Sequence, residues 1–204
     1  MHQTVVLVGN TGCGKSTQVP QIILDDYIKR GRGSECRVLV TQPRRLSAIA
    51  LAERVAEERD QDLGRTVGYQ VRLDARFSAK DTRIFFVTVG ILLRRLLDSG
   101  NLSHYSHIII DEVHERDKYT DFVLCLLKKL LPQNPHLSLI LMSASVEAPL
   151  FVRYFSLPPV NLPDAPRRGL GQSILLEIES RLFPIDVFYL EDLVEATGWR
   201  SGNF

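Results

Sequence analysis

A glycine-rich stretch close to the amino terminus has the residue types needed to hold a phosphate group. It reads GNTGCGKS at positions 9–16 and has the spacing GxxxxGK[ST]. Backbone N–H groups of such a loop turn towards an anion, the Lys15 ammonium reaches the outer phosphates, and the Ser16 hydroxyl can ligate Mg²⁺. An apolar run at 5–8 precedes the loop, and a helical pattern follows it. This order predicts a nucleoside triphosphate site at the start of a helix.

Two adjacent acids follow a second apolar run. Residues 107–110 read HIII and lead directly into Asp111 and Glu112. An acid at the end of a strand beside a phosphate loop can deliver its carboxylate to Mg²⁺, and a neighbouring carboxylate can orient and deprotonate an attacking water. A simple kinase has no need of the second acid, because it transfers the phosphoryl group to a substrate. The pair therefore favours hydrolysis of the triphosphate.

Short apolar runs alternate with helical patterns along the chain. Continuous apolar strands separated by helices are typical of a parallel sheet covered on both faces. We therefore predict a three-layer α/β/α fold with a mostly parallel sheet. The expected strands are 5–8, 37–41, 67–71, 83–87, 106–110 and 137–142, and the expected helices are 15–29, 45–58, 91–97, 120–131 and 149–155.

Helical spacing also predicts which side chains face the core. In the 120–131 helix the expected core residues are Phe122, Leu126, Leu127 and Leu130. In the 45–58 helix the expected apolar set is Leu46, Ile49, Ala50 and Val55.

Composition restricts the class of protein. The 204 residues include 25 Lys and Arg against 24 Asp and Glu, so the whole chain has no basic excess that would indicate nucleic acid. Cys13, Cys36 and Cys125 lie far apart, which argues against a zinc site or a disulfide framework and fits a reducing compartment. No apolar run approaches the length of a membrane span. We expect an intracellular protein without membrane association; the choice among cytoplasm, nucleus and mitochondrion stays open.

The composition changes after the last predicted helix. Prolines stand at 158, 159, 163 and 166, which predicts a linker or irregular excursion over 157–172. Strand character returns over 173–188, and a weak helical pattern follows.

Five motifs in this order resemble the first RecA-like domain of a DEAH-box RNA helicase, in the branch that includes RNA helicase A. They are GNTGCGKST at 9–17, TQPRR at 41–45, TVG at 88–90, DEVH at 111–114 and SAS at 143–145. The resemblance covers residues 5–155 and, weakly, 183–192. It implies a RecA-like domain at 1–156 and, at 173–204, the start of a connection to a second RecA-like domain absent from this chain. Departures at Asn10, Val113 and Ser145 remove no catalytic group.

The resemblance also implies roles for individual residues. ATP or another triphosphate would be bound by Gly9, Asn10, Thr11, Gly12, Cys13, Gly14, Lys15, Ser16 and Thr17, with the base against Arg54. The Mg²⁺ ligands would come from Ser16, Asp111 and Glu112. Catalysis would use Lys15, Asp111, Glu112 as general base and His114 as a sensor of nucleotide state. RNA would contact Gln42, Arg44, Arg45, Thr88 and Gly90, and coupling to strand movement would use Ser143 and Ser145.

The TQPRR stretch gives independent but weaker support for nucleic acid. Pro43 ends a predicted strand, so Arg44 and Arg45 lie at a turn into a helix, where guanidiniums and helix-terminal N–H groups can bind a phosphate. Contacts of that kind carry no base specificity. A solvated surface pair explains the same two arginines equally well without the resemblance.

The resulting expectation is the ATP-binding half of an ATP-dependent RNA helicase, which couples hydrolysis to movement on RNA or to its unwinding. Arginine fingers of the family lie in the second RecA-like domain, so this chain is expected to bind nucleotide and to hydrolyse it slowly. Two alternatives stay open. One is a truncated, non-enzymatic product that binds nucleotide or RNA, and the other is a P-loop NTPase that acts on a partner other than nucleic acid.

Overall fold

The sheet follows from the apolar runs of the sequence. The computed structural model describes residues 3–98, 102–144, 148–156, 173–179 and 185–199. Within them the 8-stranded sheet has the order β4-β3-β5-β2-β6-β7-β1-β8. All neighbouring strands pair in parallel except β3 and β4, which are antiparallel. The strands are β1 (Thr4–Gly9), β2 (Val38–Gln42), β3 (Val67–Val71), β4 (Asp74–Arg76), β5 (Ile84–Thr88), β6 (His107–Ile110), β7 (Ser138–Ser143) and β8 (Ile174–Ile178).

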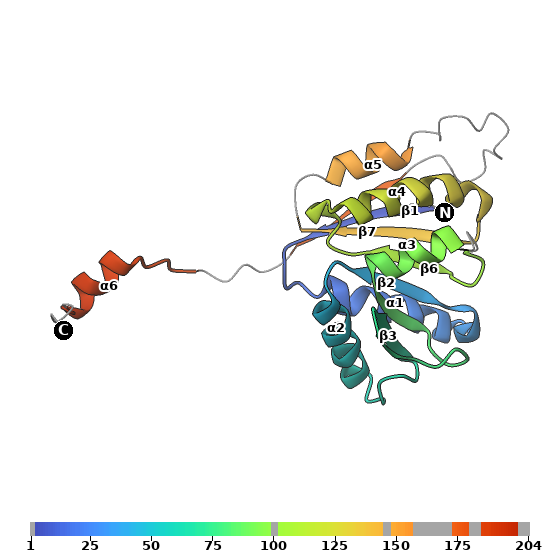
Figure 1. Cartoon of the computed structure of the whole chain (residues 1–204), viewed down its shortest axis with the longest axis horizontal. Coiled ribbons are helices and arrows are strands. Elements are labelled where there is room, and N and C mark those ends of the chain that lie inside the picture. Colours follow the sequence, from blue (N-terminus) through green and yellow to red (C-terminus); the bar gives the residue numbers. More distant parts are fainter. Residues whose placement is uncertain (1–2, 99–101, 145–147, 157–172, 180–184, 200–204) are drawn as a thin grey trace.

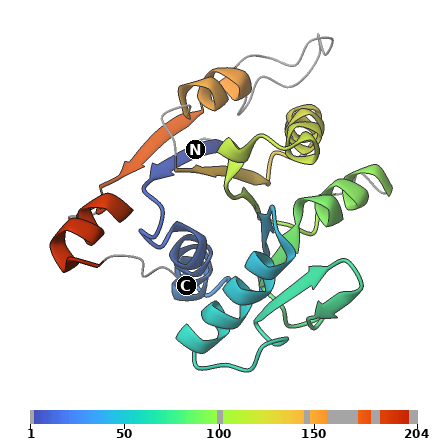
Figure 2. The same ribbon diagram turned by 60° about the vertical axis from the view of Figure 1, so that its left-hand side comes forward.

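Helices cover both faces of this sheet, as Figure 2 shows. Helices α1 (Lys15–Lys29) and α2 (Arg45–Glu58) pack on one face, and α3 (Val89–Asp98), α4 (Lys118–Leu130) and α5 (Ala148–Ser156) pack on the other. The short helix α6 (Leu190–Thr197) lies apart from these layers (Figure 1). The predicted three-layer α/β/α class is confirmed.

The strand apolar runs are continuous because both faces of the sheet are buried. In β6, Ile108 and Ile110 pack with α3, α4 and α5, whereas Ile109 packs with α1 and α2. Each of these three side chains is fully buried. This packing fixes the direction of β6 and so fixes where the residues that follow it emerge.

The structure corrects three predictions of core residues. In α4 the predicted Leu127 is buried, whereas Phe122 is 63% exposed; the other buried residues are Thr120, Val123 and Leu124. In α2 the predicted Val55 is buried, whereas Leu46 and Ala50 are exposed; the other buried residues are Ala48, Ala52 and Ala56. Small alanines one turn apart let α2 lie close to the sheet.

The segment after the predicted linker contributes to the same sheet. β8 pairs in parallel with β1, from Val5 opposite Ile174 to Gly9 opposite Ile178. The predicted boundary at residue 156 therefore leaves out one strand of the sheet. The linker itself, 157–172, lies outside the described residues. The sequence does not predict β4, because this strand has only three residues, all exposed, and two of them, Asp74 and Arg76, are charged.

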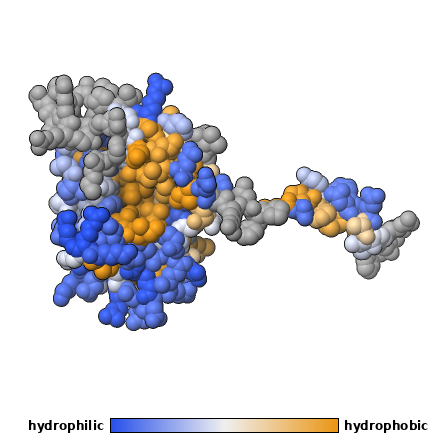
Figure 3. All heavy atoms as spheres, turned by 180° about the vertical axis from the view of Figure 1, so that it is seen from behind, coloured by the Kyte–Doolittle hydropathy of each residue, from blue (hydrophilic) through white to orange (hydrophobic). Residues whose placement is uncertain are grey.

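Apolar side chains also gather on the reverse face of the molecule, as Figure 3 shows. Ile22 of α1 and Leu176 and Ile178 of β8 are among the exposed large hydrophobic residues. The described helices thus leave part of the β8 edge uncovered. None of the helices within the described ranges has the length and apolarity that a membrane span requires.

Candidate nucleotide and nucleic-acid site

Predicted site residues from five strands lie at one edge of the sheet. Parallel strands bring their carboxyl ends to the same edge, where ligands of open α/β sheets bind. Across the strand order β1, β7, β6, β2 and β5, this edge is formed in turn by Gly9, Ser143, Asp111, Gln42 and Thr88. The register places Val8 opposite Ser143 and Gln42 opposite Thr88. Predicted nucleotide residues therefore lie at one end of the row, and predicted RNA residues lie at the other.

The loop between β1 and α1 has the backbone of a phosphate-binding turn. Gly12 and Gly14 have φ of +82° and +86°, a region that only glycine adopts without strain. The N–H of Cys13 donates to the Asn10 carbonyl at 3.3 Å. Gly14 forms the N-cap of α1 without a side-chain cap, and the first turn holds no acidic residue. The amino end of α1 therefore has the positive potential that favours an anion.

Lys15 is folded into this loop. Its side chain is buried, and Nζ donates to the carbonyls of Gly9 at 2.6 Å and Asn10 at 3.0 Å. Two neutral acceptors hold the ammonium without cancelling its charge. The Thr17 hydroxyl donates to the Gly14 carbonyl at 3.2 Å and so fixes the first turn of α1.

Asp111 is a buried carboxylate that retains capacity for a further ligand. It is only 2% exposed. Its Oδ1 accepts the N–H of Glu112 at 2.9 Å, and its Oδ2 accepts the Gln42 amide at 2.6 Å. A carboxylate has about four lone-pair sites, so two of them are still free of these contacts.

This donor set fits Mg²⁺. Carboxylate, hydroxyl and phosphate oxygens are the ligands that Mg²⁺ prefers, and it usually takes only one or two carboxylates. In the described part of the chain no group of three or more His, Cys, Asp and Glu residues could hold a metal ion.

Glu112 lies in an environment that raises its affinity for a proton. Its backbone has a left-handed φ of +51°, which turns the chain sharply after β6. Burial, and then the Asp111 charge, raise the pKa of the Glu112 carboxyl, and the charges of His114 and Lys15 oppose that rise. A raised pKa strengthens a carboxylate as a proton acceptor near neutral pH. The strand order also brings the phosphate loop at 9–16 near the acidic turn at 111–115.

The strand order gives the scale of that proximity. Only β7 separates β1 from β6, and adjacent strands lie about 4.8 Å apart, so the two strand ends lie roughly 10 Å apart. A triphosphate with its ion is of that size. Nδ1 of His114 lies 3.5 Å from Oε2 of Glu112 and accepts the N–H of Ala144 at 3.4 Å. His114 thus connects the acidic turn to the residue that follows β7.

Ser143, one of the two predicted coupling residues, is fully buried at the end of β7. It stands between the β1 loop and the β6 turn in the strand order. Ser145, the other coupling residue, lies outside the described residues.

The predicted RNA residues differ in exposure. Arg44 and Arg45 are exposed at the start of α2, which has no side-chain cap. The Arg44 guanidinium makes a 3.5 Å ion pair with Glu115. Gly90 is exposed, and a Cβ built there would have no neighbour within 4 Å, so a ligand has open access to its backbone. Thr88 is half-buried, whereas Gln42 is only 3% exposed.

Arg54 lies on α2 and is linked to the loop helix through Glu58. Its Nε donates to Oε1 of Glu58 at 2.8 Å. Oε2 of Glu58 accepts the side-chain amides of Gln18 at 2.9 Å and Gln21 at 2.8 Å, both on α1. These hydrogen bonds, the one from Gln21 first, lower the pKa of Glu58. Neither Glu58 nor Glu115 was predicted, since both read as ordinary charges on a helix or turn.

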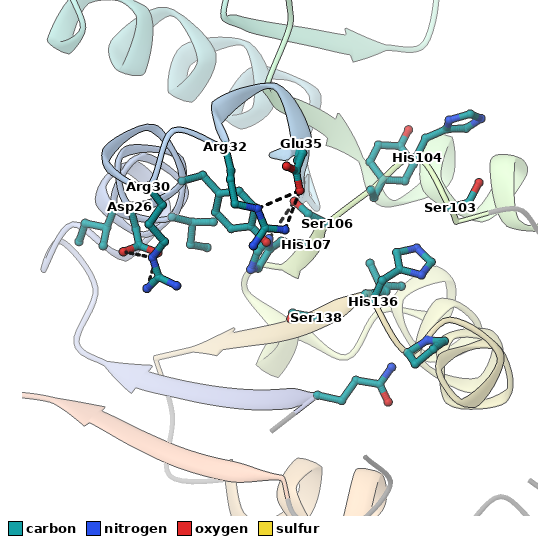
Figure 4. A pocket seen from close by; sticks show the side chains of 17 residues that line it. Asp26, Arg30, Arg32, Glu35, Ser103, His104, Ser106, His107, His136 and Ser138 are labelled. Atoms are coloured by element: carbon teal, nitrogen blue, oxygen red, sulfur yellow. Dashed lines mark hydrogen bonds and ion pairs between the residues drawn. The ribbon is translucent and has the colours of Figure 1, made fainter. Parts of the chain in front are cut away.

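A separate cavity of about 760 Å³ lies at the opposite edge of the sheet, where β6 and β7 begin (Figure 4). Its charged walls are already paired, with Arg30 to Asp26 at 2.9 Å and Arg32 to Glu35 at 2.6 Å. It is far from the strand ends that carry the predicted site, so its size gives no reason to relocate that site.

Comparison with known proteins agrees with this geometry. The sequence profile described as DEAD/DEAH box helicase matches residues 1–150. The chain is 42% identical to the DExH-box ATP-dependent RNA helicase DExH1 of Arabidopsis thaliana over 208 residues, which cover 100% of the chain and 19% of that protein. It is 44% identical to human ATP-dependent RNA helicase DHX30, with 97% of the chain and 15% of the relative covered. It is 47% identical to the human putative ATP-dependent RNA helicase DHX57, with 96% and 13% covered.

The chain thus spans less than a fifth of the length of these relatives. The family profile includes the phosphate loop and the acidic turn. Because the family profile matches residues 1–150, the chain belongs to the DEAD/DEAH box helicase family.

Proposed function

We propose that this chain is the ATP-binding half of an ATP-dependent RNA helicase. The observation that carries the proposal is the row of strand ends from Gly9 through Asp111 to Thr88, which joins a triphosphate cradle to exposed arginines on one edge. The names of the relatives support ATP and RNA as the ligands. The parent protein would use the hydrolysis to move on RNA or to unwind it.

Each residue at this edge has a defined task in the proposal. The loop N–H groups and Lys15 hold the phosphates, and the Ser16 hydroxyl and Asp111 hold Mg²⁺. The ion, when bound, neutralises charge on the outer phosphates. Glu112 orients a water molecule and accepts its proton, since its raised pKa brings proton affinity closer to neutral pH.

RNA would be held by its backbone. Arg44 and Arg45 offer two guanidiniums at the uncapped start of α2, and Thr88 and Gly90 lie at the adjacent strand end. Phosphate contacts of this type fix position and carry little sequence information. We therefore expect little sequence preference from this half of the protein.

A pair of variants tests both ligands in the same chain. Lys15→Ala should weaken the binding of a fluorescent ATP analogue in Mg²⁺ by roughly 10- to 100-fold, the value of a charge-assisted hydrogen bond, and leave RNA affinity unchanged. The double variant Arg44→Ala, Arg45→Ala should do the reverse. It should also reduce the salt slope for single-stranded RNA by about 1.4, because each phosphate contributes about 0.7. Unchanged nucleotide affinity in Lys15→Ala would exclude the proposed cradle.

A further inference from the structure

We propose that Gln42 is a positioning residue for Asp111, through which the RNA-binding turn controls the metal ligand. This inference rests on the proposed function and assigns the Gln42 side chain a task at the nucleotide site. Gln42 ends β2, and the next three residues, Pro43, Arg44 and Arg45, form the turn proposed to hold RNA.

The contact between the two residues is short and shielded. Nε2 of Gln42 donates to Oδ2 of Asp111 at 2.6 Å, and the two side chains are 3% and 2% exposed. A buried hydrogen bond to a charged acceptor is stronger than a neutral one, and losing its donor leaves a buried carboxylate oxygen without a partner. The orientation of Asp111 therefore depends on the position of Gln42.

Each carboxylate oxygen of Asp111 accepts one hydrogen bond, and the two donors come from different elements. The N–H of Glu112 binds Oδ1, and the Gln42 amide binds Oδ2. The first contact comes from the acidic turn itself, whereas the second comes from the neighbouring strand. Of these two hydrogen bonds, the one from Gln42 is the one that changes when the turn at 43–45 moves, because Gln42 directly precedes that turn.

The two turns also touch at the surface. The Arg44 guanidinium pairs with Glu115 at 3.5 Å, with side-chain exposures of 76% and 37%. An RNA phosphate that takes Arg44 away from Glu115 would pull on the turn that begins at Gln42. The buried contact would then transmit this change to Asp111.

Binding of a fluorescent ATP analogue to the full chain, with Mg²⁺ and with EDTA, tests the inference. In Gln42→Met the affinity in EDTA should equal that of the unaltered chain, and the gain on adding Mg²⁺ should fall roughly 10- to 100-fold, as for other residues that orient a metal ligand. Gln70→Met is the matched control. The Gln70 side chain, on β3, also bonds a charged residue of a neighbouring element, Arg95 of α3, and this contact lies outside the site. This variant should keep the full gain.

Three further readouts keep the inference falsifiable. The double variant Gln42→Met, Asp111→Asn should lose no more Mg²⁺ gain than Asp111→Asn alone, because Gln42 acts through Asp111. Saturating single-stranded RNA should change the Mg²⁺ gain of the unaltered chain and leave that of Gln42→Met unchanged; an equal change in both would overturn the inference. Equal melting temperatures exclude misfolding, and Gln42→Asn, whose amide is too short to reach Asp111, replaces the Met variant if that variant unfolds.

The outcomes separate the inference from the proposed function. An unaltered chain that binds no nucleotide in Mg²⁺ contradicts the proposed function. An unaltered chain that binds it, together with a Gln42→Met variant that keeps the full Mg²⁺ gain, contradicts only the role of Gln42.

Discussion

Arg44 and Glu115 form an ion pair of 3.5 Å between the turn after β2 and the turn after β6. The first turn belongs to the proposed RNA site, and the second follows the paired acids. An exposed pair of this kind contributes about 0–1 kcal/mol and is weakened by salt. It can therefore be exchanged for an RNA phosphate at little cost.

This exchange gives a prediction for RNA affinity. Glu115→Gln should free Arg44 and raise affinity for single-stranded RNA at low salt by up to about fivefold, since 1 kcal/mol corresponds to that factor. Fluorescence anisotropy with a labelled homopolymer would measure it. Glu35→Gln is the control, because Glu35 pairs with Arg32 at the opposite edge of the sheet and should change nothing. Equal gains in both variants would indicate a general charge effect.

Glu112 gives a prediction for stability against pH. Its pKa is raised in the folded chain, so the folded state binds this proton more tightly than the unfolded state does. The contribution of Glu112 to stability is thus greatest below the unfolded pKa and is lost as the pH rises through the folded pKa. Glu112→Gln should raise the melting temperature at pH 7.5, and the gain should vanish towards pH 4. A gain independent of pH would contradict the assigned cause.

His107 gives a prediction of the opposite sign, in which stability falls as the pH falls. Burial lowers its pKa from 6.5 to about 4, and its ring packs against Tyr27 at 5.8 Å. Below pH 6.5 the unfolded chain takes up a proton that the folded chain resists, so stability is lost as the pH falls from 6.5 towards 4. His107→Gln should flatten the fall in melting temperature between pH 7 and 5, whereas His104→Gln, at an exposed position, should leave it intact. Identical pH profiles in His107→Gln and the unaltered chain would rule this out.

Two positions within α4 test the packing of the core. Leu127 is fully buried, so Leu127→Ala should reduce the free energy of unfolding by about 2–5 kcal/mol. Phe122→Ala should change it by no more than about 0.5 kcal/mol, because the ring is exposed. Urea unfolding of the two variants measures both values. A large loss in Phe122→Ala would restore the core position expected from its spacing.

The apolar pattern of α4 does not distinguish its buried side from its exposed side. Residues 122–127 read FVLCLL, so almost every position of α4 there is apolar, and a periodic pattern cannot select the buried side. In α2 the spacing selects the large Leu46 as a core residue, whereas the small residues Ala48, Ala52 and Ala56 are the ones that are buried. The bounds of α1 and β3, by contrast, were predicted correctly, since glycines and polar turns delimit both segments.

The site was predictable only in its parts. Glycine spacing and the paired acids identified the loop and the turn, because each motif is local in the sequence. The contact of Gln42 with Asp111 requires β2 to lie beside β6. The sequences of these two strands do not show which strands are neighbours in the sheet. Gln42 itself was predicted as an RNA contact. That role stays a prediction, while its side chain binds Asp111 in the structure.

The central claim is that the phosphate loop and the acidic turn meet around one nucleotide-bound ion. Fe²⁺ in place of Mg²⁺, with ascorbate and peroxide, cleaves the backbone beside the ion, and mass spectrometry locates the cuts. With a non-hydrolysable ATP analogue near the dissociation constant of the unaltered chain, we predict cuts at both 9–17 and 111–113, and much weaker cuts in Lys15→Ala. Cuts at only one of these segments, or the same cuts without nucleotide, would contradict the shared site.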